Sequence, residues 1–197
     1  LYISALARGF RVLGEARYLT AARRAAAFLM TRMYDAESGQ LTRRYCDGEA
    51  AIPAFLDDYD GAEPSGNSVA TDVLLRLAHI TGDENFRDRA TRSLRAFAPK
   101  LKAQPAIAPQ MLVALGRWLS EPEQIVIRSG DQDPEAKVLL EERARQFAPY
   151  RLLFEMDDSA ALDLASVSPF LASLERKGRI TVYECRNFAC ELPQIIA

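Results

Sequence analysis

The spacing of apolar residues predicts two pairs of helices in the first part of the chain. Over residues 2–13 the apolar side chains recur three and four positions apart, on one face of a helix: Ile3, Leu6, Phe10 and Leu13. The same spacing predicts helices over 16–34, 68–80 and 84–102. In each pair a glycine ends the first helix: Gly14 in the first pair and Gly82 in the second. Two helices with such a short connection form an antiparallel hairpin.

The second predicted hairpin repeats the first at a distance of 68 residues. The shared pattern is a glycine, an acid, an aromatic residue and an alanine: Gly14, Glu15, Tyr18 and Ala22, then Gly82, Asp83, Phe86 and Ala90. Because one hairpin cannot bury its own apolar face, the repeat predicts an array or a closed ring of hairpins. A fifth helix predicted over 108–119 would cover the end of the array.

The pattern changes after Pro122. Short strands are predicted over 124–127, 152–154 and 180–183. Between them we expect a helix over 133–147 and a broken helix over 159–174 that is interrupted at Pro169. Asp133 fits a helix N-cap, followed by Pro134 at the first helical position. This alternation predicts a small, mostly parallel sheet. We therefore expect a mainly α protein, with a helical-hairpin region over 1–121 and a small α/β C-terminal unit over 122–197.

Composition and charge exclude several classes of function. Apolar residues make up 49% of the 197 residues and charged residues 26%, which is an ordinary globular mixture. The formal charge of −2 gives no basic surface for nucleic acid. No apolar run approaches the roughly 20 residues of a membrane span. The chain starts at Leu1 without Met, so we expect it to be cut from a longer protein.

The three cysteines are too few for a disulfide scaffold. Because the sequence contains only one histidine as well, a zinc site is not expected. We therefore expect no metal and no cofactor, and a cytoplasmic, reducing compartment. Cys185 and Cys190 are separated by four residues, not by the two of thioredoxin-type motifs. They could form a local disulfide or have a redox role, but reduced thiols are the favoured interpretation.

The densest group of polar residues precedes the third predicted helix. It contains the carboxylates Asp57, Asp58, Asp60 and Glu63. Asp57, Asp58 and Glu63 are candidate catalytic groups, because glycoside hydrolysis uses one protonated and one ionised carboxyl group roughly 5–10 Å apart. The alternative is structural: Asp57 or Asp58 caps a helix or pairs with a nearby arginine.

Further residues near this loop are candidates for substrate binding: Arg43, Arg44, Tyr45, Tyr59, Ser65 and Asn67. Arginine offers a rigid fork of donors and tyrosine a flat face for stacking, although simple exposure to solvent explains them equally well. Ser65 or Asn67 can cap the helix that begins near Ser68. An exposed helix N-terminus also suits a hydroxyl-rich ligand.

Three stretches of the sequence are distinctive. They are residues 41–50 with Phe-Leu-Asp-Asp-Tyr at 55–59, Asp-Gly-Ala-Glu-Pro-Ser-Gly-Asn-Ser-Val-Ala at 60–70, and Tyr-Glu-Cys-Arg-Asn-Phe-Ala-Cys at 183–190. Together they resemble the thioredoxin-domain-containing family of the spermatogenesis-associated protein type. The resemblance implies an N-terminal thioredoxin-like domain, absent here, followed by an (α/α)6 toroid. That toroid is similar to those of six-hairpin glycosidases and N-acylglucosamine 2-epimerases, so the chain would be an incomplete toroid.

The resemblance leads to two functional hypotheses. In the first, a toroid cavity binds or processes a saccharide by glycosidase- or epimerase-like acid–base chemistry. In the second, the chain is a non-catalytic interaction scaffold for the thioredoxin-like domain of the parent chain or for another protein. In that family a further hairpin lies between the positions that correspond to Tyr59 and Asp60, which are adjacent here. An incomplete ring leaves apolar flanks open, so we also expect self-association.

Overall fold

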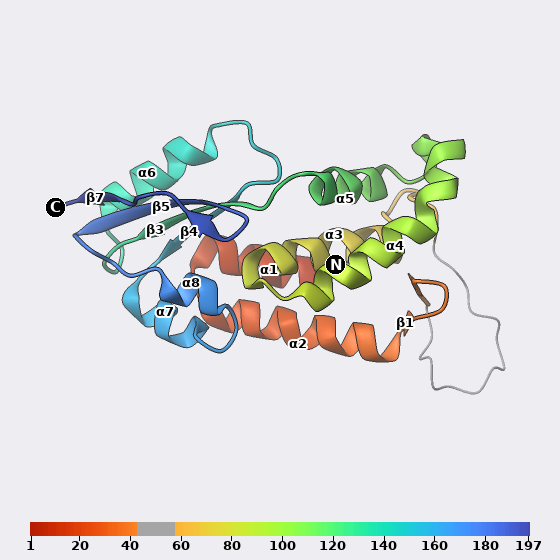
Figure 1. Cartoon of the computed structure of the whole chain (residues 1–197), viewed down its shortest axis with the longest axis horizontal. Coiled ribbons are helices and arrows are strands. Elements are labelled where there is room, and N and C mark those ends of the chain that lie inside the picture. The colour runs from red at the N-terminus through yellow and green to blue at the C-terminus, as the bar shows by residue number, and fades with distance from the viewer. Residues whose placement is uncertain (43–57) are drawn as a thin grey trace. The chain divides into compact units, whose positions relative to one another are not determined.

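The structure is a computed structural model that describes residues 1–42 and 58–197 (Figure 1). It consists of two compact units. Unit 1 contains residues 1–4, 22–78 and 83–119, and unit 2 contains residues 5–21, 79–82 and 120–197. Helices predominate in the described parts of the chain, which confirms the prediction of a mainly α protein. A toroid of hairpins, and the domain boundary at residue 121, stay predictions.

The helices of the first part lie close to their predicted positions. They are α1 (Tyr2–Leu13), α2 (Ala16–Arg32), α3 (Gly66–Thr81), α4 (Glu84–Ala103) and α5 (Pro109–Leu119), with a short 3-10 helix, η1 (Pro105–Ile107), before α5. The second helix ends two residues earlier than predicted. Tyr34 instead pairs with Leu41 in a two-stranded ribbon of β1 (Tyr34–Asp35) and β2 (Gln40–Leu41).

The two turns at the ends of α1 and α3 have the same backbone geometry. Gly14 and Gly82 adopt φ values of 72° and 71°, which only glycine adopts without steric cost. The next helix then starts in the same way in both copies: Tyr18 N–H donates to the carbonyl of Glu15, and Phe86 N–H to that of Asp83, each at 3.2 Å. These contacts show that the two connections have the same local structure at the positions where the sequence pattern repeats.

Helix α3 lies at the centre of unit 1. Every residue from Ala70 to Ala78 is buried, so this helix has no solvent-facing side over those positions. Among them is a charged residue, Asp72, whose carboxylate accepts hydrogen bonds from Arg117 Nε at 2.7 Å and from Arg76 Nη2 at 3.0 Å. Because Arg117 belongs to α5, this buried cluster connects α3 to α5.

Unit 2 contains a five-stranded sheet of β3 (Glu123–Arg128), β4 (Leu152–Met156), β5 (Ile180–Arg186), β6 (Ala189–Cys190) and β7 (Gln194–Ile196). The helices between the strands are α6 (Pro134–Ala144), α7 (Asp158–Leu164) and α8 (Pro169–Ser173). The Asp133 cap is confirmed, since its carboxylate accepts from the N–H groups of Glu135 and Ala136. One face of the sheet packs on α6 through Ile125, Ile127, Ile180 and Val182 (Figure 1). On the other face Phe154 contacts Phe10 of α1, with ring centroids 5.4 Å apart.

The prediction of a mostly parallel sheet is wrong. Only β3 and β4 pair in parallel, whereas β5 pairs antiparallel with β3, β6 and β7. The connection between β4 and β5, residues 157–179, carries the short helices α7 and α8 and is long enough for either strand direction. The alternation of strands and helices therefore does not specify the direction. Because β5 pairs antiparallel with β3, the chain re-enters the sheet at the end where β4 leaves it.

Candidate functional site

The loop that leads into α3 is held by Asp60. Its carboxylate accepts hydrogen bonds from the N–H groups of Ser65 and Gln110, both at 2.7 Å, and its own N–H donates to the carbonyl of Ile107 at 2.9 Å. Asp60 is buried, with 8% of its surface exposed. One carboxylate thus binds the backbone at the starts of α3 and α5, where the helix dipoles favour negative charge. This is a structural role.

Ser65 and Asn67, predicted to bind substrate, are both buried and bonded within unit 1. Ser65 Oγ accepts from the N–H of Ser68 at 3.0 Å, which is the capping contact considered as the alternative. Asn67 accepts from the N–H of Leu41 at 2.7 Å and donates to its carbonyl at 3.1 Å, so its amide holds β2 against α3. A role in substrate binding stays a prediction for both residues.

The remaining predicted site residues are dispersed. Asp58 forms an ion pair with Lys100 of α4, Glu63 is exposed, and Tyr59 is 57% exposed. Asp57, Arg43, Arg44 and Tyr45 lie outside the described residues. The described contacts therefore include no direct pairing of two candidate catalytic carboxylates, and the acid–base assignment stays a prediction.

Beside the start of α3 is a hollow of about 200 Å³, which we call the α3 hollow. Its wall is mainly apolar and includes Leu29 and Met33 of α2 and Val69 and Val73 of α3. Thr42 and Asn67 contribute polar groups to its lining. Asp58 and Glu63 do not line it. The α3 hollow is thus suited to an apolar occupant more than to acid–base chemistry.

Unit 2 contains a larger hollow of about 590 Å³, which we call the strand-end hollow. It lies where the parallel strands β3 and β4 end, and its lining includes Ser129, Lys137, Glu155, Asp157 and Asp163. Sequence reasoning missed it. A usable signal was present, because ligands in α/β sheets often bind outside the carboxyl ends of parallel strands, and Ser-Gly-Asp follows the strand at 129–131.

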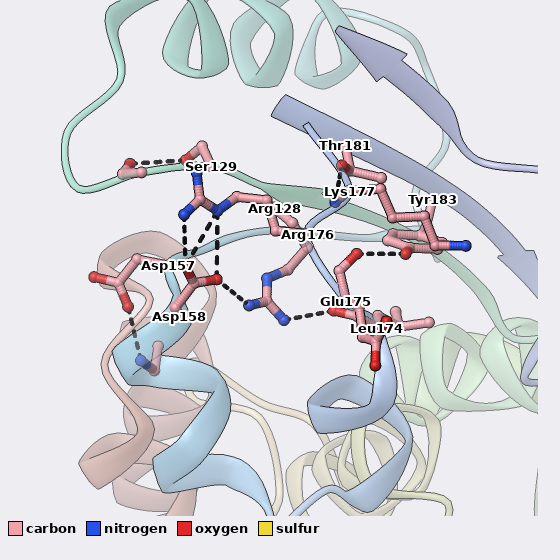
Figure 2. Close-up of polar contacts among 12 residues, drawn as sticks. Arg128, Ser129, Asp157, Asp158, Leu174, Glu175, Arg176, Lys177, Thr181 and Tyr183 are labelled. Carbon is pink, nitrogen blue, oxygen red and sulfur yellow. Dashed lines mark hydrogen bonds and ion pairs between the residues drawn. The ribbon is translucent and has the colours of Figure 1, made fainter. Parts of the chain in front are cut away.

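A network of charged side chains connects the end of β3 to α7 and to the segment that follows α8 (Figure 2). Arg128 is 3% exposed and donates to the carbonyl of Leu174 at 2.6 Å and to Asp158 at 2.9 Å. Arg176 donates to the same carboxylate at 2.7 Å. The hydrogen bonds from Arg176, and then from Arg128, hold the pKa of Asp158 below its ordinary value of 3.8. Since one carboxylate binds both guanidinium groups, we interpret the network as structural.

The structure corrects the expectation of reduced thiols at Cys185 and Cys190, which form a disulfide. Both residues lie opposite each other in the β5–β6 pair, with Cα atoms 3.9 Å apart. The tight turn at Asn187 and Phe188 produces this register, because both residues adopt positive φ, as in the two-residue turns of β-hairpins. A redox role stays a prediction.

In the described residues, 1–42 and 58–197, no three His, Cys, Asp or Glu side chains are grouped so that they could hold a metal ion. No helix within these ranges is long and apolar enough to cross a membrane.

The described residues form a helix-rich unit 1 and a unit 2 that contains a small sheet with helices. No family model matches the chain. It is similar to spermatogenesis-associated protein 20 of Homo sapiens, with 33% identity over 162 residues, which are 81% of this chain and 21% of that protein. It is 37% identical over 146 residues to spermatogenesis-associated protein 20 of Mus musculus, covering 73% of this chain and 18% of that protein. The chain thus spans about a fifth of the length of these curated relatives.

Proposed function

We propose that this chain is a non-catalytic interaction scaffold of helical hairpins that binds an apolar helix in the α3 hollow. One observation carries the proposal. Beside that hollow, the buried polar side chains Asp60, Ser65 and Asn67 make hydrogen bonds within the fold, while the hollow itself is open and mainly apolar. Polar side chains whose hydrogen bonds hold the backbone are poor candidates for catalysis. An exposed apolar surface favours association with another protein segment.

The occupant that we propose is a helix from the rest of a longer protein. The curated relatives are about four times as long as this chain, so most of such a protein lies outside it. Leu29, Met33 and Val69 are half-buried in the α3 hollow. Completing the burial of one such side chain is worth about 1 kcal/mol, and an amphipathic helix would cover several at once. The alternatives are a thioredoxin-like domain and a second copy of this chain.

Thiol labelling of the full-length protein tests this proposal. A cysteine introduced by Leu29→Cys should react about a hundredfold more slowly than one introduced by Ala27→Cys, because a covered thiol reacts only after local opening. Ala27 is an exposed neighbour on α2 outside the hollow and is the matched control. Equal labelling rates would reject the proposal. Protection that rises with protein concentration would indicate a second copy as the occupant.

Saccharide binding is the second candidate function. Acid–base chemistry by Asp58 and Glu63, which belong to unit 1, is a separate prediction. The strand-end hollow favours saccharide binding, because its volume of about 590 Å³ is in the range of small-molecule sites. Its carboxylates, Lys137 and the hydroxyl of Ser129 are suitable hydrogen-bond partners for sugar hydroxyls. The exposed ring of Tyr59, on the loop before α3, could stack on a sugar face.

Calorimetry and a glycan array on the full-length protein test this second function. Asp163→Asn, in the strand-end hollow, should weaken saccharide binding, while Glu142→Gln, an exposed change outside it, should not. If the loop before α3 is catalytic, Asp58→Asn or Glu63→Gln should abolish turnover and leave binding intact. Full turnover by both variants would defeat the acid–base assignment, and no saccharide binding by the unmodified protein would defeat the function.

A further inference from the structure

The disulfide of unit 2 lies next to a buried amide that lacks one hydrogen bond. Gln124 of β3 is directly opposite Cys185 of β5, so the two side chains are neighbours on the same face of the sheet. Gln124 is 0% exposed, and its Nε2 donates to the carbonyl of His79 at 2.7 Å. Its Oε1 is buried and has no hydrogen-bond donor among the residues that the structure describes. Such an acceptor is costly, because water cannot reach it.

We propose that Cys185 and Cys190 form a thiol–disulfide exchange site for dithiol substrates, and that Gln124 stabilises its reduced form. In the disulfide, Cys185 has no hydrogen to donate. In the reduced form its S–H is a donor, although a weak one, on the cross-strand neighbour of Gln124, whose Oε1 is unsatisfied. The amide thus favours reduction, while its bond to His79 is unaffected by the redox state.

Burial decides which sulfur is attacked. Cys185 is 1% exposed, whereas Cys190 is half-buried and lies on the short outer strand β6 between exposed neighbours, Ala189 and Glu191. A thiolate of the dithiol attacks Sγ of Cys190, and the bond to Cys185 breaks. Cys185 leaves as a thiolate, is protonated and donates to Gln124. The mixed disulfide joins the first sulfur of the dithiol to Cys190 Sγ. The second thiolate of the dithiol attacks that first sulfur, and Cys190 leaves as a thiolate and is protonated. The dithiol loses two electrons and two protons, which the cysteine pair gains.

Other contacts keep the two sulfurs adjacent after reduction. Glu191 N–H donates to the carbonyl of Glu184 at 3.0 Å, and Asn187 N–H to that of Pro122 at 2.9 Å. The ring of Phe188 packs edge-on against Phe170, with centroids 5.1 Å apart. The cross-link also closes a loop with a sequence separation of only 5, over which a disulfide constrains the unfolded chain least. The hairpin is therefore preserved without the disulfide, and the bond can form again.

Equilibration of the full chain with reduced and oxidised dithiothreitol tests the proposal. Cys46→Ser is included in every sample so that only the pair titrates, and free thiols are counted by alkylation and mass spectrometry. Gln124→Leu should shift the equilibrium about tenfold toward the disulfide, which is a potential about 30 mV more negative. Gln194→Leu, an exposed change on β7, should leave it unchanged. Equal potentials for the two variants would reject the role of Gln124.

Single-cysteine variants test the exchange independently of Gln124. Cys185→Ser, which retains Cys190, should react with a disulfide reagent such as dithionitrobenzoate at least about tenfold faster than Cys190→Ser, since reactivity follows access. Faster reaction of Cys185 would overturn the assigned order of attack. Resistance of the folded pair to an excess of dithiothreitol would overturn the exchange site itself.

Discussion

The buried carboxylate of Asp72 provides a quantitative test of unit 1. Its two oxygens accept hydrogen bonds from Arg117 at 2.7 Å and from Arg76 at 3.0 Å. The side chain of Asp72 is 8% exposed, that of Arg117 is 5% exposed and that of Arg76 is 9% exposed. Asp72→Asn preserves the size of the side chain and removes its charge. Two guanidinium groups then stay buried beside a neutral amide.

The expected loss of stability follows from this burial. An ion pair on the surface contributes about 0–1 kcal/mol, because water screens it. Removal of one partner from a buried ion pair costs about 3–5 kcal/mol. All three side chains are less than a tenth exposed, so the second range applies. At roughly 2–4 °C per kcal/mol for a chain of this size, the melting temperature should fall by about 6–20 °C.

Urea unfolding followed by circular dichroism and by tryptophan fluorescence measures this loss. The midpoint should fall while the m-value stays constant, since the surface exposed on unfolding is unchanged. Asp88→Asn, an exposed carboxylate on α4, is the matched control and should change stability by less than about 0.5 kcal/mol. Replacement of the three residues by apolar residues of similar volume should restore most of the loss. A loss below about 1 kcal/mol for Asp72→Asn would refute the reasoning, because the cluster would then be screened by water.

Three further predictions concern the turns, the helix caps and the response to pH. Gly14→Ala should cost about 1–2 kcal/mol in urea unfolding, because φ is 72° there, whereas Gly130→Ala, with no atom within 4 Å of the added carbon, should have little effect. Asp60→Ala should cost about 2–4 kcal/mol by the same assay, since the buried N–H of Ser65 and the part-buried N–H of Gln110 lose a charged acceptor. A loss near zero would contradict its capping role. Arg176 lowers the folded-state pKa of Asp158. The ionised carboxylate of Asp158 therefore stabilises the fold fully above about pH 5, and this contribution disappears as the pH falls through the lowered pKa. Unmodified protein should therefore lose more stability than Asp158→Asn between about pH 5 and pH 2, and equal losses would contradict the ion pairs.

The sequence alone determined the features that depend on neighbours along the chain. The apolar spacing located helices α1 to α5 to within a few residues, because a helix aligns positions three and four apart. Gly14 and Gly82 were identifiable as turns because only glycine adopts their backbone angles without steric cost. Asp133 was identifiable as a cap because its partners are only two and three residues away.

Only the tertiary structure decided the features that depend on residues far apart in the chain. Asp60 looked like a member of an acidic site, but its second partner, Gln110, is 50 positions away. The direction of β5 is visible only in its antiparallel pairing with β3, and the strand-end hollow depends on that sheet. Gln124 had no visible relation to Cys185 until strand pairing placed them opposite each other. Periodicity specifies which face of an element is apolar, whereas partners, strand direction and burial of charge are set only when separate elements pack together.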